Sequence, residues 1–438
     1  MICQFSFENY KSFRDEVTLD FQATNIHEFD ESLLSSRLSP QKKILPVAAI
    51  YGPNGGGKSG VLEALGSLIG FVLRPIEMQT NDLESLTIQP RARIVPFKLD
   101  EESRKRPTKF ELFFRTENAE YRYRVSLELT GGLRETFSEP IRINDESLYR
   151  RKLTGKSTAM LFMRDGDGTK IGSTIKVKAI SENIKSSMPL LSFLYNTYEI
   201  DVISEAVGWF KSCLIYSSYY LEYPYFGRRN SAKKLYDVID REKDIDKIIA
   251  HMDLGIKNIH IFQESVFFKE EERTMYSLNL IHQVMGKEYL LSENEESAGT
   301  QKILNLLSDL VLSLQDGRML IADELDANLH PKLLEQIILF YKNPRINIGG
   351  GQLLFTSHDL STMNNRLFRR DEIWFAAKDE SESSILYSLS EIKDEKGSSI
   401  RSDASYGKQY LNGRFGADPY FKRMLEWGNN GKLACIKE

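Results

Sequence analysis

The segment Gly52–Ser59 constrains the fold more than any other stretch of this chain of 438 residues. It reads GPNGGGKS and fits the pattern G-x-x-x-x-G-K-[ST] of a phosphate-binding loop. The apolar run Ile44–Tyr51 precedes it and has the length of a buried parallel strand. Behind the loop, apolar residues from Val61 to Ile69 recur at helical spacing. Strand, loop and helix in this order favour a phosphate site over a glycine-rich turn before an ordinary helix.

Each residue type in this loop has a physical role in holding a phosphate. Glycines let the backbone wrap an anion without side-chain clash, and N–H groups at a helix start attract negative charge. We expect Lys58 to reach the β- and γ-phosphates of ATP, and the Ser59 hydroxyl to ligate Mg²⁺. The sequence therefore predicts ATP and Mg²⁺ as cofactors. The predicted phosphate-binding residues are Asn54, Gly55, Gly56, Gly57, Lys58 and Ser59.

Composition and charge narrow the class of protein. With 41% hydrophobic and 27% charged residues, the chain can build a large globular core. The net charge of -4 gives no overall basic signal for nucleic acid. Three separated cysteines, Cys3, Cys213 and Cys435, suggest neither a disulfide framework nor a zinc site. No run approaches ~18 apolar residues and charges interrupt the N-terminus, so we expect a cytoplasmic protein with no membrane contact.

The periodicity of apolar residues predicts the elements around the loop. Expected strands cover residues 2–8, 17–21, 93–99, 109–115, 120–129, 147–153, 158–164, 258–268, 274–291, 318–322 and 352–356. Expected helices cover 199–212, 231–252, 299–315 and 331–341, and 24–43 is expected to be a loop. Buried strands with intervening helices indicate an α/β fold with a parallel sheet.

Since the phosphate loop and the later buried strands are far apart, the sequence predicts a nucleotide-binding core that is split by an insertion. We expect residues 1–185 to hold the first half of the core with a β-rich lobe. Residues 186–255 are expected to form a helical insertion. Residues 256–438 are expected to hold the second half of the core and a C-terminal tail.

Two strand ends carry further chemistry. Asp323 and Glu324 close the apolar run Met319–Ala322, which is the Walker B pattern. By itself an acidic pair after a strand usually begins a loop, but the phosphate loop in the same chain favours the functional interpretation. We expect Asp323 to hold Mg²⁺ and Glu324 to act as general base. His358 ends the next buried strand, where it would contact the γ-phosphate and the attacking water rather than being a satisfied surface histidine.

The order of these motifs resembles a known family. Phosphate loop, Ser-x-Gly-x-Gln before a helix, apolar-Asp-Glu and strand-Ser-His resemble ABC-type ATPase heads, as in SMC, Rad50, RecF and overcoming-lysogenisation-defect proteins. In these relatives the signature of one subunit caps the nucleotide held by another. The resemblance implies that Ser297, Gly299 and Gln301 touch a partner's ATP, and that Asp326 lies across the dimer interface. The signature here reads ESAGTQ, not LSGGQ.

Other segments narrow the resemblance. The N-terminal FSFENYKSFRD is similar to the "NFRSF" opening of these ATPases, with Lys11 in the arginine's place. Residues Arg369–Phe375, Leu386–Leu389 and Tyr410–Gly416 resemble the C-terminal part of AAA-type ATPases of bacterial phage-resistance and abortive-infection systems, such as RloA and AbiL proteins. The ATPase subunits of PARIS systems are more distant relatives.

This resemblance implies a fold and a role. The fold class would be α/β: an ABC-ATPase (P-loop NTPase) head with a split parallel-sheet core, a β-rich lobe and a helical insertion. The protein would hydrolyse ATP, form a homodimer or higher homo-oligomer through shared ATP sites, and control a separate effector protein, expected to be a nuclease. A phage-derived molecule would activate the ATPase. The resemblance does not decide whether the protein binds nucleic acid.

Three rivals remain. A DNA-repair ATPase of the RecF or Rad50 kind predicts DNA-stimulated hydrolysis and a basic groove, although a long coiled coil is missing from the sequence. A transporter ATPase subunit would need a coupling surface for a membrane partner. A nucleotide-gated scaffold would bind ATP and scarcely turn it over.

Three sequence features imitate functional motifs. Ile348–Gln352 looks like a signature, but it follows the Walker B strand and precedes a strand, so we predict a tight loop. Asp165-Gly-Asp167 has the spacing of a metal-binding Asp-x-Asp, but its setting predicts a hairpin turn. Trp374 and Tyr410 are expected in the core rather than as base-stacking platforms.

Overall fold

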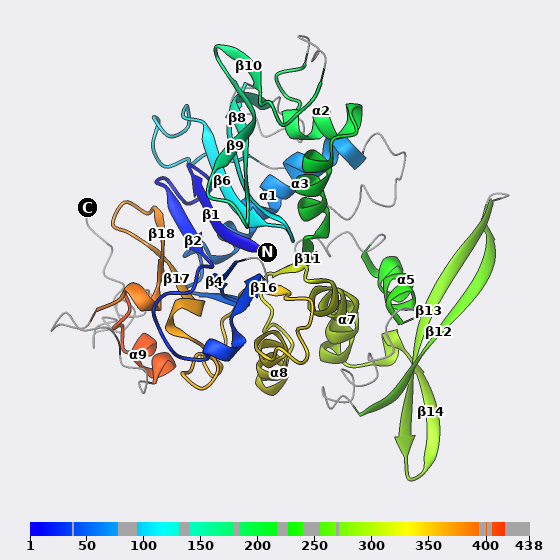
Figure 1. The fold of residues 1–438 in the computed structure, drawn as a ribbon. Coiled ribbons are helices and arrows are strands. Elements are labelled where there is room, and N and C mark those ends of the chain that lie inside the picture. The colour runs from blue at the N-terminus through cyan, green and yellow to red at the C-terminus, as the bar shows by residue number, and fades with distance from the viewer. Residues whose placement is uncertain are drawn as a thin grey trace.

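A computed structural model describes most of the chain. The described residues are 1–36, 39–77, 94–130, 141–177, 184–216, 227–239, 255–268, 271–393, 400 and 405–416. Two large sheets dominate them, one of six strands and one of seven, and a three-stranded arm projects from the body (Figure 1). We call them the core sheet, the lobe sheet and the arm.

The core sheet positions the site. Its order is β11-β15-β16-β5-β17-β18, in which the first five strands run parallel and β18 is antiparallel. The strands are β11 (Leu214–Tyr216), β15 (Met319–Ala322), β16 (Gln352–Thr356), β5 (Val47–Tyr51), β17 (Ile373–Lys378) and β18 (Ser384–Ser388). Because β16 lies between β5 and β15, three neighbouring strands end at the same edge of the sheet. The phosphate loop, the Walker B acids and His358 therefore meet there.

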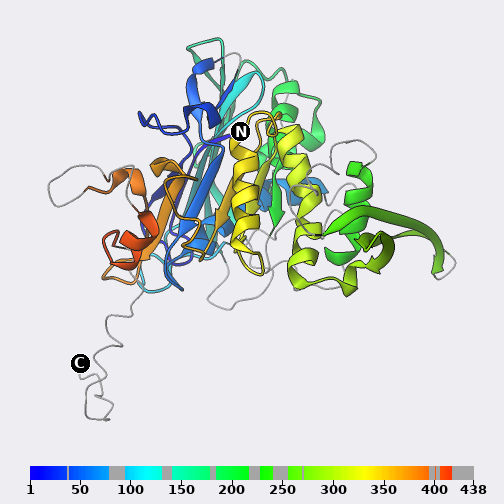
Figure 2. The same cartoon turned by 90° about the horizontal axis from the view of Figure 1, so that it is seen from below.

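Helices bury both faces of this sheet (Figure 2). In β5, Ala48 and Ile50 pack into the cluster that holds α1 (Lys58–Glu77). Alternate residues of the same strand pack into the cluster of α7 (Ala298–Asp316) and α8 (Pro331–Lys342). This two-sided burial explains the continuous apolar sequence of β5. Among the described helices, α1 is long and apolar enough to cross a membrane, but 78% of its most apolar window is buried inside the protein.

The lobe sheet is antiparallel, in the order β10-β9-β8-β7-β6-β1-β2. It packs against α1, α2 (Leu190–Thr197) and α3 (Asp201–Ser212). The contact includes Phe114, whose ring centroid lies 4.6 Å from that of Trp209. The strands are β1 (Ile2–Glu8), β2 (Val17–Asp20), β6 (Thr108–Arg115), β7 (Ala119–Leu129), β8 (Ile141–Lys152), β9 (Thr158–Asp165) and β10 (Gly168–Ile171).

The arm leads directly into the second half of the core. It consists of β12 (Ile256–Phe268), β13 (Glu271–Val284) and β14 (Lys287–Ser292), in antiparallel order. Its base packs against α5 (Gly227–Ile239), and the short 3-10 turn Glu293–Glu295 connects β14 to α7. Smaller elements are the hairpin β3 (Leu34–Ser36) and β4 (Ser39–Ile44), and α9 (Tyr406–Leu411).

The fold is the predicted α/β head with a split parallel core, and most predicted elements lie where the sequence placed them. Residues 94–98 are a correction, because they form no strand. The carbonyl of Val95 accepts from Lys11 N–H, and Phe97 N–H donates to the Asn9 side chain, so the N-terminal turn takes the place of a strand partner.

Four further predictions need a correction or a limit. Residues 24–43 are not all loop, since β3 and β4 form a hairpin there. The run 274–291 is two strands, which a turn with Met285 and Gly286 at positive φ separates. The helix predicted over 231–252 is described to Ile239, and 240–252 lie outside the described residues. The predicted helical region 186–255 also contains β11, a strand that the sequence reading missed.

Candidate functional site

Tight packing fixes the conformation of the phosphate loop. A Cβ on Gly52 would lie 2.1 Å from the carbonyl oxygen of Ala376 in β17, and one on Gly56 would lie 2.6 Å from it. Gly57 has a φ of 109°, and a Cβ there would lie 2.7 Å from Ser384 Oγ in β18. Side chains are therefore excluded at these three positions. At the loop tip Asn54 and Gly55 are exposed, and Gly55 has a φ of 75°.

Lys58 and Ser59 begin α1. The Lys58 ammonium is buried and donates to the carbonyl oxygens of Gly52 at 2.9 Å and Pro53 at 3.1 Å. Burial lowers the pKa of Lys58, while the nearby carboxylates of Asp323, Glu324 and Asp326 act in the opposite direction. The lysine therefore lies within the electrostatic field of the Walker B acids, although it is 265 to 268 positions away from them in the sequence.

Asp323 joins the two halves of the core. Its Oδ1 accepts from Ser59 Oγ at 3.0 Å and from Thr356 Oγ1 at 2.6 Å. The same Thr356 hydroxyl accepts from the backbone N–H of Glu324 at 2.7 Å. Thr356 is fully buried at the end of β16. One hydroxyl thus positions both Walker B acids, and this residue was not among the predicted site residues.

Glu324 has an unusual backbone. Its φ is 48°, in the left-handed region that residues with a side chain rarely adopt. Its side chain is exposed at the carboxyl edge of the core sheet. Such a conformation costs on the order of 1–3 kcal/mol, so surrounding contacts must hold it. The bond to Thr356 is one of these contacts.

His358 and Asp326 lie together. Asp326 Oδ2 accepts from the backbone N–H of His358 at 3.0 Å. Its other oxygen, Oδ1, is buried without a hydrogen-bond partner among the described residues. The His358 side chain is exposed. His358, which was predicted to contact the γ-phosphate, and Asp326, which was predicted to lie at the dimer interface, are therefore neighbours within one chain.

The signature segment Ser297–Gln301 forms the start of α7. Ser297 is the N-cap, is exposed, and its Oγ accepts from Thr300 N–H at 3.1 Å. A Cβ on Gly299 would lie 2.8 Å from the carbonyl oxygen of Asn328. The Gln301 amide donates to the Glu296 carbonyl at 3.0 Å. The segment therefore packs on the chain that follows the Walker B acids, and Ser297 is the signature residue exposed at the helix start.

Lys302 connects this helix to the Walker B end. Its ammonium donates to the carbonyl oxygens of Glu324 and Ala327, both at 2.8 Å. Burial lowers its pKa to about 8, against the raising effect of the nearby carboxylates. Lys302 follows directly after the signature, and it was not among the predicted site residues. A basic residue at this position was the signal that could have found it.

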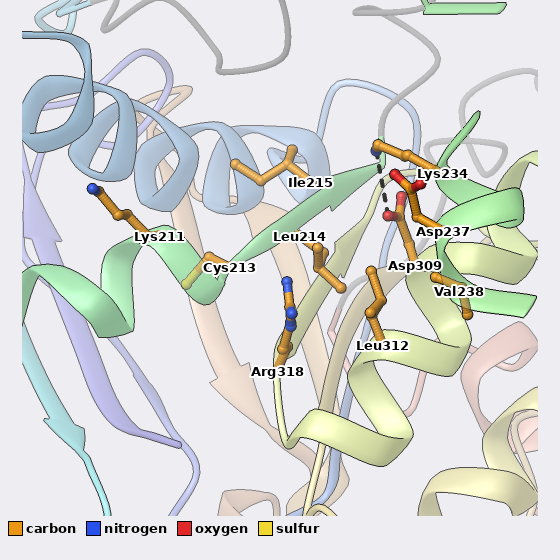
Figure 3. Close-up of a pocket in the computed structure, with 10 residues that line it drawn as sticks. All are labelled: Lys211, Cys213, Leu214, Ile215, Lys234, Asp237, Val238, Asp309, Leu312 and Arg318. Carbon is orange, nitrogen blue, oxygen red and sulfur yellow. Dashed lines mark hydrogen bonds and ion pairs between the residues drawn. The ribbon is translucent and has the colours of Figure 1, made fainter. Parts of the chain in front are cut away.

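A hollow lies away from these residues. Its volume is about 320 Å³, and it opens between β11, α5 and α7 (Figure 3). Lys234 and Asp309 form an ion pair of 3.4 Å at one end of it. None of its lining residues belongs to the phosphate loop or to the Walker B end. We therefore assign the nucleotide chemistry to the strand ends, where the functional groups converge, and not to this hollow.

The residues at the strand ends fit ATP with Mg²⁺. Loop backbone, the Lys58 ammonium and the N-terminus of α1 supply positive potential for phosphates. Ser59 and Asp323 place two oxygen ligands together, and the orphaned oxygen of Asp326 can accept another donor. No group of three or more His, Cys, Asp or Glu in the described residues could hold a metal alone. The pair Ser59 and Asp323 suits Mg²⁺, which usually takes one or two protein oxygens and completes its shell with phosphate and water.

The three sequence features that resemble functional motifs have structural roles. Residues 348–351 form a loop with Gly350 at a φ of 72°, and it leads into β16. Asp165 Oδ1 accepts from Asp167 N–H in the β9–β10 turn. Trp374 and Tyr410 are both buried. None of these segments contributes to the site at the strand ends.

Fold and site together define a class of protein: a P-loop NTPase with the head fold of ABC-type ATPases. The sequence of residues 47–364 matches the family model described as "AAA domain, putative AbiEii toxin, Type IV TA system", and the chain belongs to this family. A search of curated proteins found no match.

Solved structures with a related shape include SMC heads. The head domain from Thermotoga maritima is 12% identical, has a TM-score of 0.39, and the match covers 88% of this chain and 98% of that one. The Smc head with a coiled coil and joint from Pyrococcus yayanosii is 10% identical with a TM-score of 0.39, covering 89% and 97% of the two chains. The fold assignment rests on the strand order and the family match rather than on these scores.

Proposed function

We propose that this protein is an ATP-binding and ATP-hydrolysing subunit of a bacterial anti-phage, abortive-infection-like defence system. In this proposal, nucleotide-dependent oligomerisation senses infection and controls a separate effector protein, a nuclease. The family description supports a role in a two-component system, because it names a putative toxin of a toxin–antitoxin system. The resemblance of the C-terminal segments to phage-resistance ATPases supports the defence role.

One observation carries the ATPase part of the proposal. Ser59 Oγ and Thr356 Oγ1 both donate to the same oxygen of Asp323, so the phosphate loop and the Walker B strand meet at a shared carboxylate. Hydroxyl and carboxylate oxygens are the ligands that Mg²⁺ prefers. Bound ATP with Mg²⁺ would supply the γ-phosphoryl group and the charge that neutralises it.

The residues of this chain would then have distinct roles. Lys58, released from the loop carbonyls, would hold the β- and γ-phosphates, and Ser59 with Asp323 would hold the metal. Glu324 would take a proton from the attacking water, and His358 would orient that water and the γ-phosphate. Backbone N–H groups of Asn54–Gly57 would hold phosphate oxygens.

The second protomer would complete the site. Ser297 is exposed at the N-terminus of α7, where a helix start favours an anion. In the proposed homodimer, or higher homo-oligomer, Ser297, Gly299 and Gln301 of one protomer would approach the γ-phosphate held by its partner. Asp326 would lie at the same interface. The bonds of Lys302 to the Walker B end would couple the signature of each protomer to its own catalytic base.

Glu324→Gln tests the proposal. The variant keeps size and hydrogen bonding but loses the base, so it should bind ATP and lose on the order of 10²–10⁴ in turnover. Phosphate release and binding of a fluorescent ATP analogue measure the two properties separately, with and without DNA. Unchanged turnover would remove Glu324 as the base. Strong stimulation by DNA would favour a DNA-repair ATPase over the defence role.

A further inference from the structure

The arm that precedes the signature segment has one buried and one open face. Figures 1 and 2 both show β12 and β13 extending away from the body of the molecule. At the base, Ile256, Leu278 and Leu280 are buried in the cluster that includes α5 and α7. This packing anchors the arm. It leaves the more distant part of both strands outside the core.

The face opposite the anchor exposes large apolar side chains. Phe262 is 44% exposed, Met275 42% and Leu290 56%. The strand pairing puts them on the same face, because Met275 lies opposite Glu264 and Leu290 lies opposite Ile281. Directly paired residues and alternate residues of one strand share a face. Phe262 and Met275 therefore lie on neighbouring strands of the solvent face, and Leu290 lies further along this face, beyond Ser277 and Asn279.

The outer edge of β12 is also open among the described residues. The sheet order β12-β13-β14 puts this strand at an edge, and it is 13 residues long. Edge strands of sheets are usually short, or are protected by proline, by charged side chains or by an element that covers them. β12 contains no proline, and its two charged side chains are Glu264 and Lys257, of which Lys257 pairs with Glu288 of β14. A long edge with so little protection is a template for another strand.

We propose that β12 pairs antiparallel with β12 of a second copy of this chain. An isologous pair around a two-fold axis has one register with full overlap, and its centre is the middle residue of Ile256–Phe268. That residue is Phe262. Phe262 then lies opposite Phe262 of the second copy. His260 of each copy lies opposite Glu264 of the other copy, which gives two equivalent pairs.

This register gives better side-chain pairs than the two registers that are shifted by one residue. His260, Phe262 and Glu264 share the exposed face, because each is two residues from the next. An imidazole N–H can donate to the opposing carboxylate, and the two phenyl rings bury each other. Moving the centre by one residue in either direction places Phe262 opposite His260 or Glu264 instead. The charge pairing would then be lost.

The bulge near the base shortens the regular part of the edge. Pairing of β12 with β13 shifts register between Ile256 and Asn258, which bends the edge at one end. The eleven residues 258–268 remain, and their middle is residue 263, so the register centred on Phe262 pairs the nine residues 258–266 and is selected by its side chains rather than by overlap. The contact joins two sheets of three strands into one of six and covers the exposed Phe262 at its axis.

The contact is distinct from the shared ATP site, and it needs no nucleotide. The arm nevertheless lies close to the signature in the sequence, since Ser297 follows the end of β14 by five residues. Paired arms would therefore hold two signature segments in one assembly before ATP binds. The proposal goes beyond the proposed function and does not depend on it.

Cysteine cross-linking tests the register. In a Cys435→Ser background the two remaining cysteines, Cys3 and Cys213, are buried. Phe262→Cys would place two thiols across the axis at a Cα separation of about 4.5–5.5 Å, within reach of a disulfide. Copper phenanthroline should cross-link nucleotide-free Phe262→Cys to a dimer. The matched control, Gln283→Cys, is exposed on β13 near the far end of the same face and should stay monomeric on denaturing gels.

A charge swap tests the pairing itself. In sedimentation velocity without nucleotide, wild type should dimerise, and His260→Glu should weaken dimerisation at least tenfold because it faces Glu264. The double variant His260→Glu, Glu264→His should restore it. A nucleotide-free monomer at every concentration, or a double variant as weak as the single one, would overturn the proposal. ATP-dependent dimerisation of Glu324→Gln is measured separately, so either idea can fail alone.

Discussion

Thr356→Val isolates the hydroxyl that joins the two halves of the site. Valine has nearly the shape of threonine, so the fully buried end of β16 keeps its packing. The variant removes the 2.6 Å bond to Asp323 and leaves Glu324 N–H without its 2.7 Å acceptor. A hydrogen bond to a charged group contributes about 1.5–3 kcal/mol, and an orphaned donor costs about 1–3 kcal/mol where water cannot reach it.

We expect this loss to appear in turnover as well as in stability. If about 2 kcal/mol of it falls on the transition state, phosphate release slows roughly 30-fold. The reason is that Asp323 loses one of its two donors and the strained backbone of Glu324 loses an anchor. Thr356→Ser is the matched control. It keeps the hydroxyl and removes a buried methyl, which costs about 1 kcal/mol of folding free energy.

The assay compares three proteins at saturating ATP and Mg²⁺. Thermal unfolding without nucleotide reports stability, binding of a fluorescent ATP analogue reports affinity, and phosphate release reports turnover. We expect Thr356→Ser to be less stable and nearly as active as wild type, and Thr356→Val to lose activity beyond its loss of stability. If both variants turn over ATP within twofold of each other, the Thr356 hydroxyl does not position the Walker B acids.

Three other predictions follow from the geometry. Gly52→Ala should abolish ATP binding or folding, since its Cβ would lie 2.1 Å from a carbonyl oxygen of β17, whereas Gly55→Ala, with no atom within 4 Å, should bind ATP with a modest loss from its φ of 75°. Lys302→Met should lower turnover roughly tenfold through loss of two hydrogen bonds, with partial recovery in Lys302→Arg and unchanged ATP affinity in both. Burial raises the pKa of Cys3 to about 11 and of Cys213 to about 12, so both stay protonated at pH 8. In the Cys435→Ser variant a thiol reagent should label neither until denaturant is added, and rapid labelling of this native variant would contradict their burial.

The sequence predicted the parts of the site that are local. Gly52–Ser59 and the strand before it form one continuous pattern, and β15 and β16 have long enough apolar runs to be recognised. The three residues of β11 have no such signal. This strand exists because it pairs with β15, where Asp323 N–H donates to the Tyr216 carbonyl at 3.0 Å. Contacts of this kind depend on tertiary structure and leave no periodicity in the sequence.

Thr356 shows the same limit at the level of one residue. A threonine at the end of a buried strand is common, because β-branched residues favour strands. Its role arises from the order of the sheet, which puts β16 between the strand of the phosphate loop and the Walker B strand. Lys302 and Ser384 are similar cases, since each reaches its partner only after distant elements have packed. Motifs reveal the groups that face the nucleotide, and the fold reveals the groups that hold them.

The packing of Gly57 has a consequence for how nucleotide binding would be transmitted. A Cβ there would lie 2.9 Å from the ring of Phe13 and 2.7 Å from Ser384 Oγ, so the loop fits between the N-terminal turn and β18. Ser12 and Ser384, 372 positions apart, are themselves bonded through their hydroxyls at 2.8 Å. Because interiors are close-packed, a loop that moves to accept a phosphate must displace one of these neighbours. The N-terminal turn leads into the lobe sheet, and β18 lies at the edge of the core sheet. The phosphate loop therefore contacts groups that belong to both sheets, so we expect any movement of the loop on phosphate binding to displace residues of the lobe sheet or of the core sheet.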